Sequence, residues 1–382
     1  MSVTTHQTLD TEYNADCVEW CPLSGYQDIL LCGTYQLQQQ ESTESAGEQT
    51  RVGCLYMYSL DTQSGVPTLQ QCTRLDMPGV LDIKWSCEPV QGHPTFALVN
   101  SIGELQLYKL GSNKAVSIET KAELSPHSLG LSLEWNNLTG HSEDLQIVSS
   151  DSSGHVHVHQ LGGASLDTID TWKAHDYEAW ISAFNQANTQ LVFTGGDDCR
   201  LKGWDLRAGT ASPVFNSKRH TMGVCSIQSN PIEPHMLATG SYDEHLLVWD
   251  TRQMKSPTQE VDLGGGVWRV KWEPNTARYI LTATMYNGFH VLDMTGESCS
   301  IASHYSEHQS IGYGADWCRL PSKMMDFHGK QFTASASTEE LQLECSNTRV
   351  KREHCQNVIS TCSFYDHLLK LWTFSDCTEN TE

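Results

Sequence analysis

The chain repeats one pattern, Lys173-Ala-His-Asp-Tyr-Glu-Ala-Trp180 followed by Thr194-Gly-Gly-Asp-Asp-Cys-Arg-Leu-Lys-Gly-Trp204-Asp205. It returns as Arg219-His-Thr-Met-Gly-Val-Cys225 followed by Thr239-Gly-Ser-Tyr-Asp-Glu-His-Leu-Leu-Val-Trp249-Asp250. Equivalent His, Asp and Trp residues of the two copies are each 45 residues apart. A fixed period of this length indicates a repeat architecture.

Within each copy a His precedes the Trp-Asp pair by 29 residues, and a turn-type Asp precedes the Trp by six. This spacing is typical of a WD40 propeller blade, in which a buried His bonded to a tight-turn Asp locks the outer loop to the inner strands. We therefore expect structural roles for the His, Asp and Trp of both copies, and the same for His367 beside Asp366. The six residues are His175, Asp198, Trp204, His220, Asp243 and Trp249.

Weaker copies share a strand that ends in an aromatic or polar residue, and they bring the number of repeats to seven. They contain Cys17–Trp20, Leu81–Trp85, Leu131–Trp135, Gly266–Trp272 and Tyr313–Trp317. The sequence thus predicts an all-β, seven-bladed WD40 β-propeller as a single domain over residues 1–382. A strand around Val3–Leu9 would complete the last blade and close the ring. Two segments without the period, 36–51 and 319–354, are predicted as surface insertions, and 375–382 as an acidic tail.

Composition excludes several classes of protein. Lys and Arg total 24 against 46 Asp and Glu, a formal charge of −22, which disfavours binding to nucleic acid or to an anionic membrane. The segment Met1–Asp10 is polar, and no run approaches the roughly 20 apolar residues that span a bilayer. The 14 cysteines are scattered and are expected to be reduced. These features predict a cytoplasmic protein.

A candidate site emerges four residues before the end of each inner strand, where the chain enters from the face that binds ligands in most propellers. Three aromatic residues and a carboxylate gather there, beside a polar set that includes Asp82, Ser226 and Arg269. Such side chains could simply fill the central hole, or Trp180, Trp268 and Tyr313 could form an aromatic cage for a quaternary ammonium group. The seven positions are Asp16, Leu81, Leu131, Trp180, Cys225, Trp268 and Tyr313.

Metal and cofactor sites are not predicted. The run His155-Val-His-Val-His159 puts three imidazoles on one face of a strand, about 6.6 Å apart, where they converge poorly on a metal. Paired Cys-x-x-Cys, His-Glu-x-x-His, Gly-x-Ser-x-Gly, P-loop and dinucleotide patterns do not occur.

Several segments are more particular than a generic propeller, and they resemble the diphthine methyl ester hydrolases, a WD40 family of diphthamide biosynthesis also called diphthine methyltransferases. The resemblance extends over nearly the whole chain outside the two insertions. It is carried by Gln7–Glu12, Ala15–Pro22, Cys32–Leu37, Ala174–Asn185, Ser217–Ser229, Ala238–His245, Gly265–Arg269, Tyr313–Trp317 and Thr361–His367.

The resemblance implies hydrolysis of the methyl ester on methylated diphthine, a modified histidine of eukaryotic elongation factor 2, which yields diphthine and methanol. Diphthine carries a trimethylammonium group, which suits the predicted cage. For the chemistry, Arg269 could stabilise the oxyanion, Asp16 or Asp82 could act as the base, and Cys225 or Ser226 could attack, with His220 a more distant base.

Three other functions compete with this interpretation. A noncatalytic adaptor that binds elongation factor 2 or an enzyme of diphthamide biosynthesis is favoured by the missing catalytic motif. A reader of methylated lysine would use the same cage. A transferase that uses a methyl donor is disfavoured, because no Gly-rich nucleotide loop follows a strand.

Overall fold

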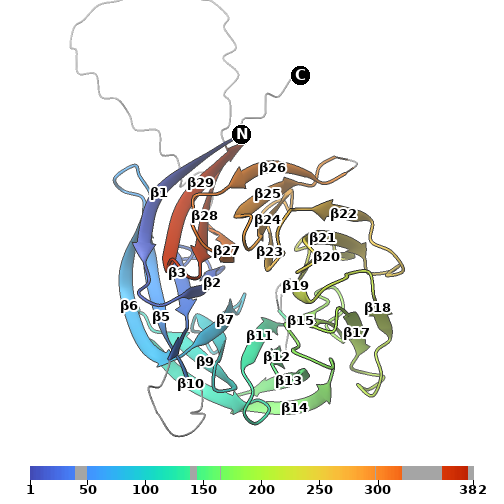
Figure 1. Ribbon diagram of the computed structural model, residues 1–382. Helices are drawn as coiled ribbons and strands as arrows, with labels where there is room; N and C mark the ends of the chain where they lie inside the picture. The colour runs from blue at the N-terminus through green and yellow to red at the C-terminus, as the bar shows by residue number, and fades with distance from the viewer. Residues whose placement is uncertain (39–49, 138–143, 164, 297, 321–354, 377–382) are drawn as a thin grey trace, which may run out of the picture.

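The computed structural model describes residues 1–38, 50–137, 144–163, 165–296, 298–320 and 355–376, and these residues form seven antiparallel sheets around a central axis (Figure 1). The prediction of an all-β, seven-bladed propeller is confirmed. No helix that could cross a membrane occurs in the described part of the chain.

Each blade has four main strands, which follow one another from the channel outward. Blade one holds β2 (Ala15–Trp20), β3 (Ile29–Thr34), β5 (Thr50–Asp61) and β6 (Thr68–Pro78), with the short β4 (Gln36–Gln38) paired to β5. Blade two holds β7 (Val80–Trp85), β8 (Thr95–Asn100), β9 (Glu104–Leu110) and β10 (Val116–Glu123). Blade three holds β11 (Gly130–Trp135), β12 (Gln146–Asp151), β13 (His155–Gly162) and β14 (Ser165–Lys173).

Blade four holds β15 (Ile181–Phe184), β16 (Leu191–Gly195), β17 (Leu201–Asp205) and β18 (Phe215–Ser217). Blade five holds β19 (Val224–Ser229), β20 (Met236–Ser241), β21 (His245–Asp250) and β22 (Gln259–Asp262). Blade six holds β23 (Arg269–Trp272), β24 (Tyr279–Ala283), β25 (Phe289–Asp293) and β26 (Ser300–Tyr305). Blade seven holds β27 (Gly312–Trp317), β28 (Cys355–Ser363), β29 (Leu368–Asp376) and β1 (Ser2–Asp10).

The N-terminal strand closes the ring. β1 pairs antiparallel with β29 over its whole length, so the first residues of the chain form the outer strand of the last blade (Figure 1). The predicted closing strand is therefore confirmed. Closure matters because it gives the edge of β29 a partner instead of leaving its backbone groups open.

Inner strands meet around the channel through side chains that accept backbone N–H groups of the next blade. Ser132 Oγ accepts the N–H of Ser182 at 2.9 Å, and the Glu134 carboxylate accepts that of Phe184 at 2.6 Å. Asp316 accepts the N–H of Trp20 at 2.7 Å, which joins blade seven to blade one. Together with the bonds from Asp82 to the Leu133 N–H and from Ser226 to the Val270 N–H, they form a belt that holds blades two to three, three to four, five to six and seven to one together.

The structure differs from prediction at the edges of the irregular segments. Residues 36–38 and 50–51, expected in an insertion, pair as β4 and the start of β5. Arg319 is held against the Asp316 carboxylate at 3.5 Å instead of belonging to a surface loop. β29 continues to Asp376, where the Tyr279 hydroxyl donates to the carboxylate at 2.5 Å. The remainder, 39–49, 321–354 and 377–382, lies outside the described residues.

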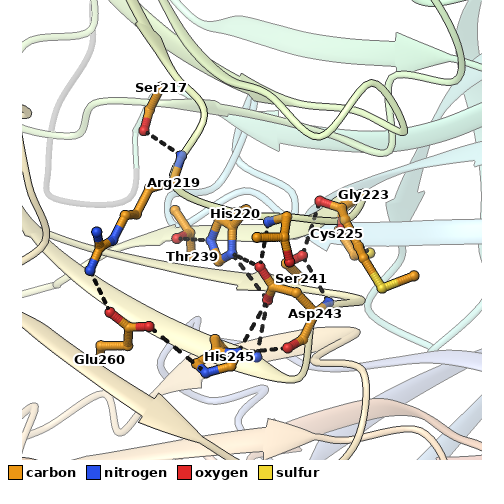
Figure 2. A network of polar contacts seen from close by, with 12 residues as sticks. Ser217, Arg219, His220, Gly223, Cys225, Thr239, Ser241, Asp243, His245 and Glu260 are labelled. Atoms are coloured by element: carbon orange, nitrogen blue, oxygen red, sulfur yellow. Dashed lines mark hydrogen bonds and ion pairs between the residues drawn. The ribbon is translucent and has the colours of Figure 1, made fainter.

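The His and Asp residues of the two clear repeats form the expected locks. His175 bonds Asp198 through Nδ1 and Thr194 through Nε2, both at 2.8 Å, and the Trp204 indole donates to the same threonine. Blade five repeats this arrangement with His220 between Asp243 and Thr239 (Figure 2). Both imidazole nitrogens are paired in each lock, which is how a polar group can be buried without a large cost.

In blade seven the lock uses His308, and His367 has its structural role in the β28–β29 turn, where its carbonyl accepts the Thr11 N–H. His308 contacts Ser363 Oγ at 2.5 Å and Thr361 Oγ1 at 2.9 Å, and Ser363 in turn donates to Asp366. His367 instead occupies a turn with φ of 57°. His308 lies 64 residues before Trp372, because the segment 319–354 is inserted between them. The 29-residue spacing of the other repeats therefore could not reveal His308.

The three histidines of β13 lie along one strand face and bond different partners. His157 contacts Asp151 at 2.9 Å and Thr171 at 3.0 Å, while His159 contacts Ser149 at 2.9 Å. Among the described residues, no group of three His, Cys, Asp or Glu side chains is placed to hold a metal.

Replacing His308 should therefore destabilise the fold, whereas replacing His367 should not. We expect His308→Ala to lower the free energy of unfolding by about 2 kcal/mol, because buried Thr361 and Ser363 lose their shared partner. His367→Asn, which suits the positive φ, should stay within about 0.5 kcal/mol of wild type. Denaturant unfolding of both variants decides this, and equal losses would contradict the assignment.

Candidate functional site

A cavity of about 100 Å³ lies at the mouth of the channel, and all seven positions chosen from the sequence line it. Its remaining lining comes from Tyr35, Tyr242 and Arg269. The structure thus brings Asp16, Trp180, Cys225, Trp268 and Tyr313 together. Asp82 and Ser226 do not line the cavity.

A local break in strand pairing directs several of these side chains into the mouth. The register between the first two strands of a blade shifts at Asp16, Leu81, Leu131, Cys225 and Tyr313. A β-bulge leaves one residue unpaired and changes where its side chain points. In blades four and six, Trp180 and Trp268 come directly before the first paired residue of the inner strand.

Aromatic rings form a continuous arc along one side of the cavity. Trp268 stacks on Tyr313 with centroids 4.7 Å apart, and stands edge to face with Trp180 at 5.5 Å. Tyr242 contacts both tryptophans, and Phe364 joins Tyr313 to Tyr35. We call these six residues the aromatic arc. Since Trp268 and Tyr313 stack on each other, the predicted three-residue cage is instead part of a longer wall.

Tyr35, Tyr242 and Phe364 were not among the site residues predicted from the sequence. Each is the first residue after the second strand of its blade, following Thr34, Ser241 and Ser363. An aromatic residue at that repeated position was the signal that could have found them.

The Asp82 carboxylate is bonded to other protein groups and does not line the cavity. Its carboxylate accepts bonds from Lys84 Nζ at 2.6 Å and the Leu133 N–H at 3.2 Å, and pairs with Arg269 Nη1 at 3.3 Å. Burial alone would raise its pKa, but Lys84 and Arg269 bring the pKa below the usual range. Asp82 therefore holds the Arg269 guanidinium at the cavity wall.

Asp16 is buried as well, yet no hydrogen bond or ion pair to its carboxyl comes from the described residues. Burial raises the pKa of Asp16 to about 8, with Arg269 lowering it and Asp82 raising it. Asp16 and Arg269 consequently face the cavity as a carboxyl and a cation whose side chains are available to a ligand.

Neither predicted nucleophile is activated. Burial raises the pKa of the Cys225 thiol well above its usual value, and its sulfur donates to the Gly223 carbonyl at 3.3 Å. Ser226 Oγ accepts the Val270 N–H at 3.0 Å, as part of the belt between blades. A thiolate or an alkoxide is not favoured at either position.

Buried ion pairs also join inner strands of different blades. Lys271 Nζ lies 2.5 Å from Glu19 and 3.5 Å from Asp316, all three from inner strands.

Comparisons with known proteins agree on the family. The model of the WD domain, G-beta repeat, matches residues 211–250. Diphthine methyltransferase of Mus musculus is 37% identical, over 96% of this chain and 93% of that protein. Diphthine methyltransferase of Homo sapiens is 36% identical, over 96% and 97%. A chain of the solved mitotic checkpoint complex has a TM-score of 0.67 at 17% identity, covering 98% and 95%, which supports the fold alone.

The unpaired carboxyl of Asp16 gives the protein a pH-dependent stability. A folded-state pKa near 8, against an ordinary value of 3.8, means the folded protein keeps a proton that the unfolded chain loses, so stability falls as pH rises through this window. Asp16→Asn cannot titrate, and we expect its stability relative to wild type to increase from pH 4 to about 8 and then level off.

Asp82→Asn is the matched control for this measurement. Because the pKa of Asp82 is lowered, its stabilising contribution is present above the ordinary pKa and is lost only as the pH falls further. Asp82→Asn should therefore be less stable than wild type by a constant amount over the pH range in which Asp16→Asn becomes more stable relative to wild type. Thermal unfolding from pH 4 to 9 tests both, and a pH-independent difference for Asp16→Asn would show that Asp16 is already ionised.

Proposed function

The chain belongs to the diphthine methyltransferase family of WD40 proteins, and from that premise we propose that it hydrolyses the methyl ester of methylated diphthine on elongation factor 2. The products are diphthine and methanol, within diphthamide biosynthesis. The observation that carries this proposal is that Asp16 and Arg269 both line a pocket walled by the aromatic arc. We further propose that the enzyme works in the cytoplasm on the modified factor.

The pocket suits a substrate with a trimethylammonium group. Indole and phenol faces attract such a cation by about 0.5–2 kcal/mol per contact, depending on how far it is desolvated. The volume of about 100 Å³ is below the roughly 150 Å³ cavity that accommodates benzene, and a trimethylammonium group is smaller than benzene. A bound cation would also favour the ionised form of Asp16.

Asp16 and Arg269 supply the two functions that ester hydrolysis requires. The Asp16 carboxylate removes a proton from water as the water oxygen bonds to the ester carbon, and the Arg269 guanidinium stabilises the resulting oxyanion. When the tetrahedral intermediate collapses, the bond to methoxide breaks and Asp16 returns the proton, giving methanol. A base with a pKa of about 8 is well matched to this work near neutral pH.

Water as the second reactant distinguishes this proposal from methyl transfer, although the relatives are named methyltransferases. Sites for drug-sized ligands and cofactors usually measure about 300–1,000 Å³. The mouth pocket is smaller than that range, which favours water over a nucleoside methyl donor beside the substrate. A noncatalytic adaptor would use the pocket for binding alone, and Asp16 would then have no effect on a reaction.

The reaction is tested by incubating the purified protein with elongation factor 2 that carries methylated diphthine, without methyl donor or ATP. We expect catalytic loss of the ester methyl group with release of methanol, and a rate that rises with pH to a plateau above about 8. Asp16→Asn should lower kcat about a hundredfold or more, and Cys225→Ala far less. Tight binding with no methyl loss would identify an adaptor.

The role of the aromatic arc is tested separately, by measuring the affinity for the modified factor. We expect Trp268→Ala to weaken affinity for the modified factor between about twofold and thirtyfold, since one cation–π contact is lost. Trp268→Phe should retain most of the affinity, and the unmodified factor should not distinguish the variants. Isothermal titration calorimetry measures this, and equal affinities for wild type and Trp268→Ala would contradict the role of the arc.

A further inference from the structure

A second and larger cavity, of about 300 Å³, lies between blades six and seven on the face that carries the mouth. We call it the blade 6–7 groove. Its walls are the β24–β25 turn, the segment 304–311 that links the two blades, and the β28–β29 turn. Nothing in the proposed hydrolysis uses it.

Packed aromatic rings lie between the groove and the mouth pocket. The ring centroid of Tyr365, which lines the groove, lies 5.1 Å from that of Phe364. The Phe364 centroid lies 5.1 Å from that of Tyr313, which lines the pocket. Ile311 lines the groove and packs in the same apolar cluster as Tyr313 and Trp268. A molecule that occupies both cavities would therefore pass over these rings.

Two highly exposed tyrosines flank the groove. Tyr286 is 82% exposed and Tyr365 is 67% exposed, although both side chains are large and partly apolar. Around them lie asparagine, glycine, serine and glutamine residues. Rigid tyrosines combined with small polar residues are typical of surfaces that bind polypeptides, since the rings provide area and the polar groups provide hydrogen bonds.

Hydrogen bonds donated by main-chain N–H groups join the walls of the groove and fix its shape. The Tyr365 N–H donates to Ser310 Oγ at 3.0 Å, and the Gln309 N–H donates to the Asp366 carboxylate at 3.1 Å. The Gly312 N–H donates to the Met285 carbonyl at 2.9 Å, which joins the blades. A groove already fixed in shape binds without a large ordering cost.

Charge around the groove selects the kind of segment that fits. Its described lining residues include His304 and His308 but no Lys or Arg, and burial, with the charge of Lys370, lowers the pKa of His308. Glu307 and Asp366 adjoin the groove, in a chain of net charge −22. A neutral or basic partner is therefore favoured over an acidic one.

We propose that the blade 6–7 groove binds an extended, neutral-to-basic segment of the substrate protein, next to the modified residue whose ester end enters the mouth pocket. This inference rests on the proposed function, because it assumes that the pocket receives a residue borne by a protein. It makes Tyr286 and Tyr365 specificity residues for a protein substrate over a free modified amino acid.

The double variant Tyr286→Ala/Tyr365→Ala tests the groove with two substrates. For elongation factor 2 carrying methylated diphthine, we expect KM to rise about tenfold or more while kcat changes little. For the free N-acetylated methyl ester of diphthine, both constants should match wild type, because this small probe reaches only the pocket. Tyr177→Ala is the matched control, since Tyr177 is 63% exposed and precedes Trp180 in its loop, away from the groove.

Each outcome separates the groove from the reaction. If wild type hydrolyses the protein substrate and the double variant has an unchanged KM, the groove proposal is overturned and the hydrolase stands. If wild type binds the modified factor without hydrolysis, the hydrolase falls, and the ratio of dissociation constants for wild type and double variant then decides the groove. If wild type neither binds nor hydrolyses the factor, both proposals fall.

Discussion

Closure of the ring by β1 is the constraint on which the rest of the structure depends. β1 forms the outer strand of blade seven, but its side chains also reach the neighbouring blades: Gln7 bonds the Leu69 backbone in blade one, and Thr5 bonds the Tyr305 hydroxyl in blade six. The first residues of the chain thereby hold blade seven against blade one and blade six. The mouth pocket requires this, because Asp16 comes from blade one and Tyr313 from blade seven.

The polar residues of the channel divide into those that build the ring and those that face a ligand. Asp82, Ser226 and Asp316 accept N–H groups of the next blade, and Asp82 also holds Arg269. Asp16 stands at a bulge, where the regular pairing of the strand is interrupted. Asp82 and Asp316 are thus hydrogen-bonded within the protein, whereas Asp16 has no such bond from the described residues. Asp16 also shares the cavity with the Arg269 cation, and a buried carboxyl in such surroundings has a shifted pKa, as groups that perform acid–base chemistry often do.

In the function that we propose, the two cavities on this face recognise different parts of the substrate. The small pocket has the aromatic arc together with Asp16 and Arg269, which suits the methylated, cationic end group of the proposed substrate. The larger groove has exposed tyrosines and polar side chains, so it can distinguish a protein-borne group from a free one. The bonds between the walls of the groove, and the one from the Gly312 N–H to the Met285 carbonyl, hold blades six and seven in fixed relation.

The sequence by itself determined the ring, its seven blades, the strand that closes it and the seven positions around the mouth, because each depends on a local period that repeats. It did not determine which of Asp16, Asp82, Cys225 and Ser226 remains available, since that depends on partners from other blades, such as Leu133 for Asp82 and Val270 for Ser226. His308 was missed because an insertion broke its spacing, and Tyr35, Tyr242 and Phe364 because they follow second strands. Only the tertiary structure decided these points, because burial and hydrogen-bond partners are set by residues far apart in the chain.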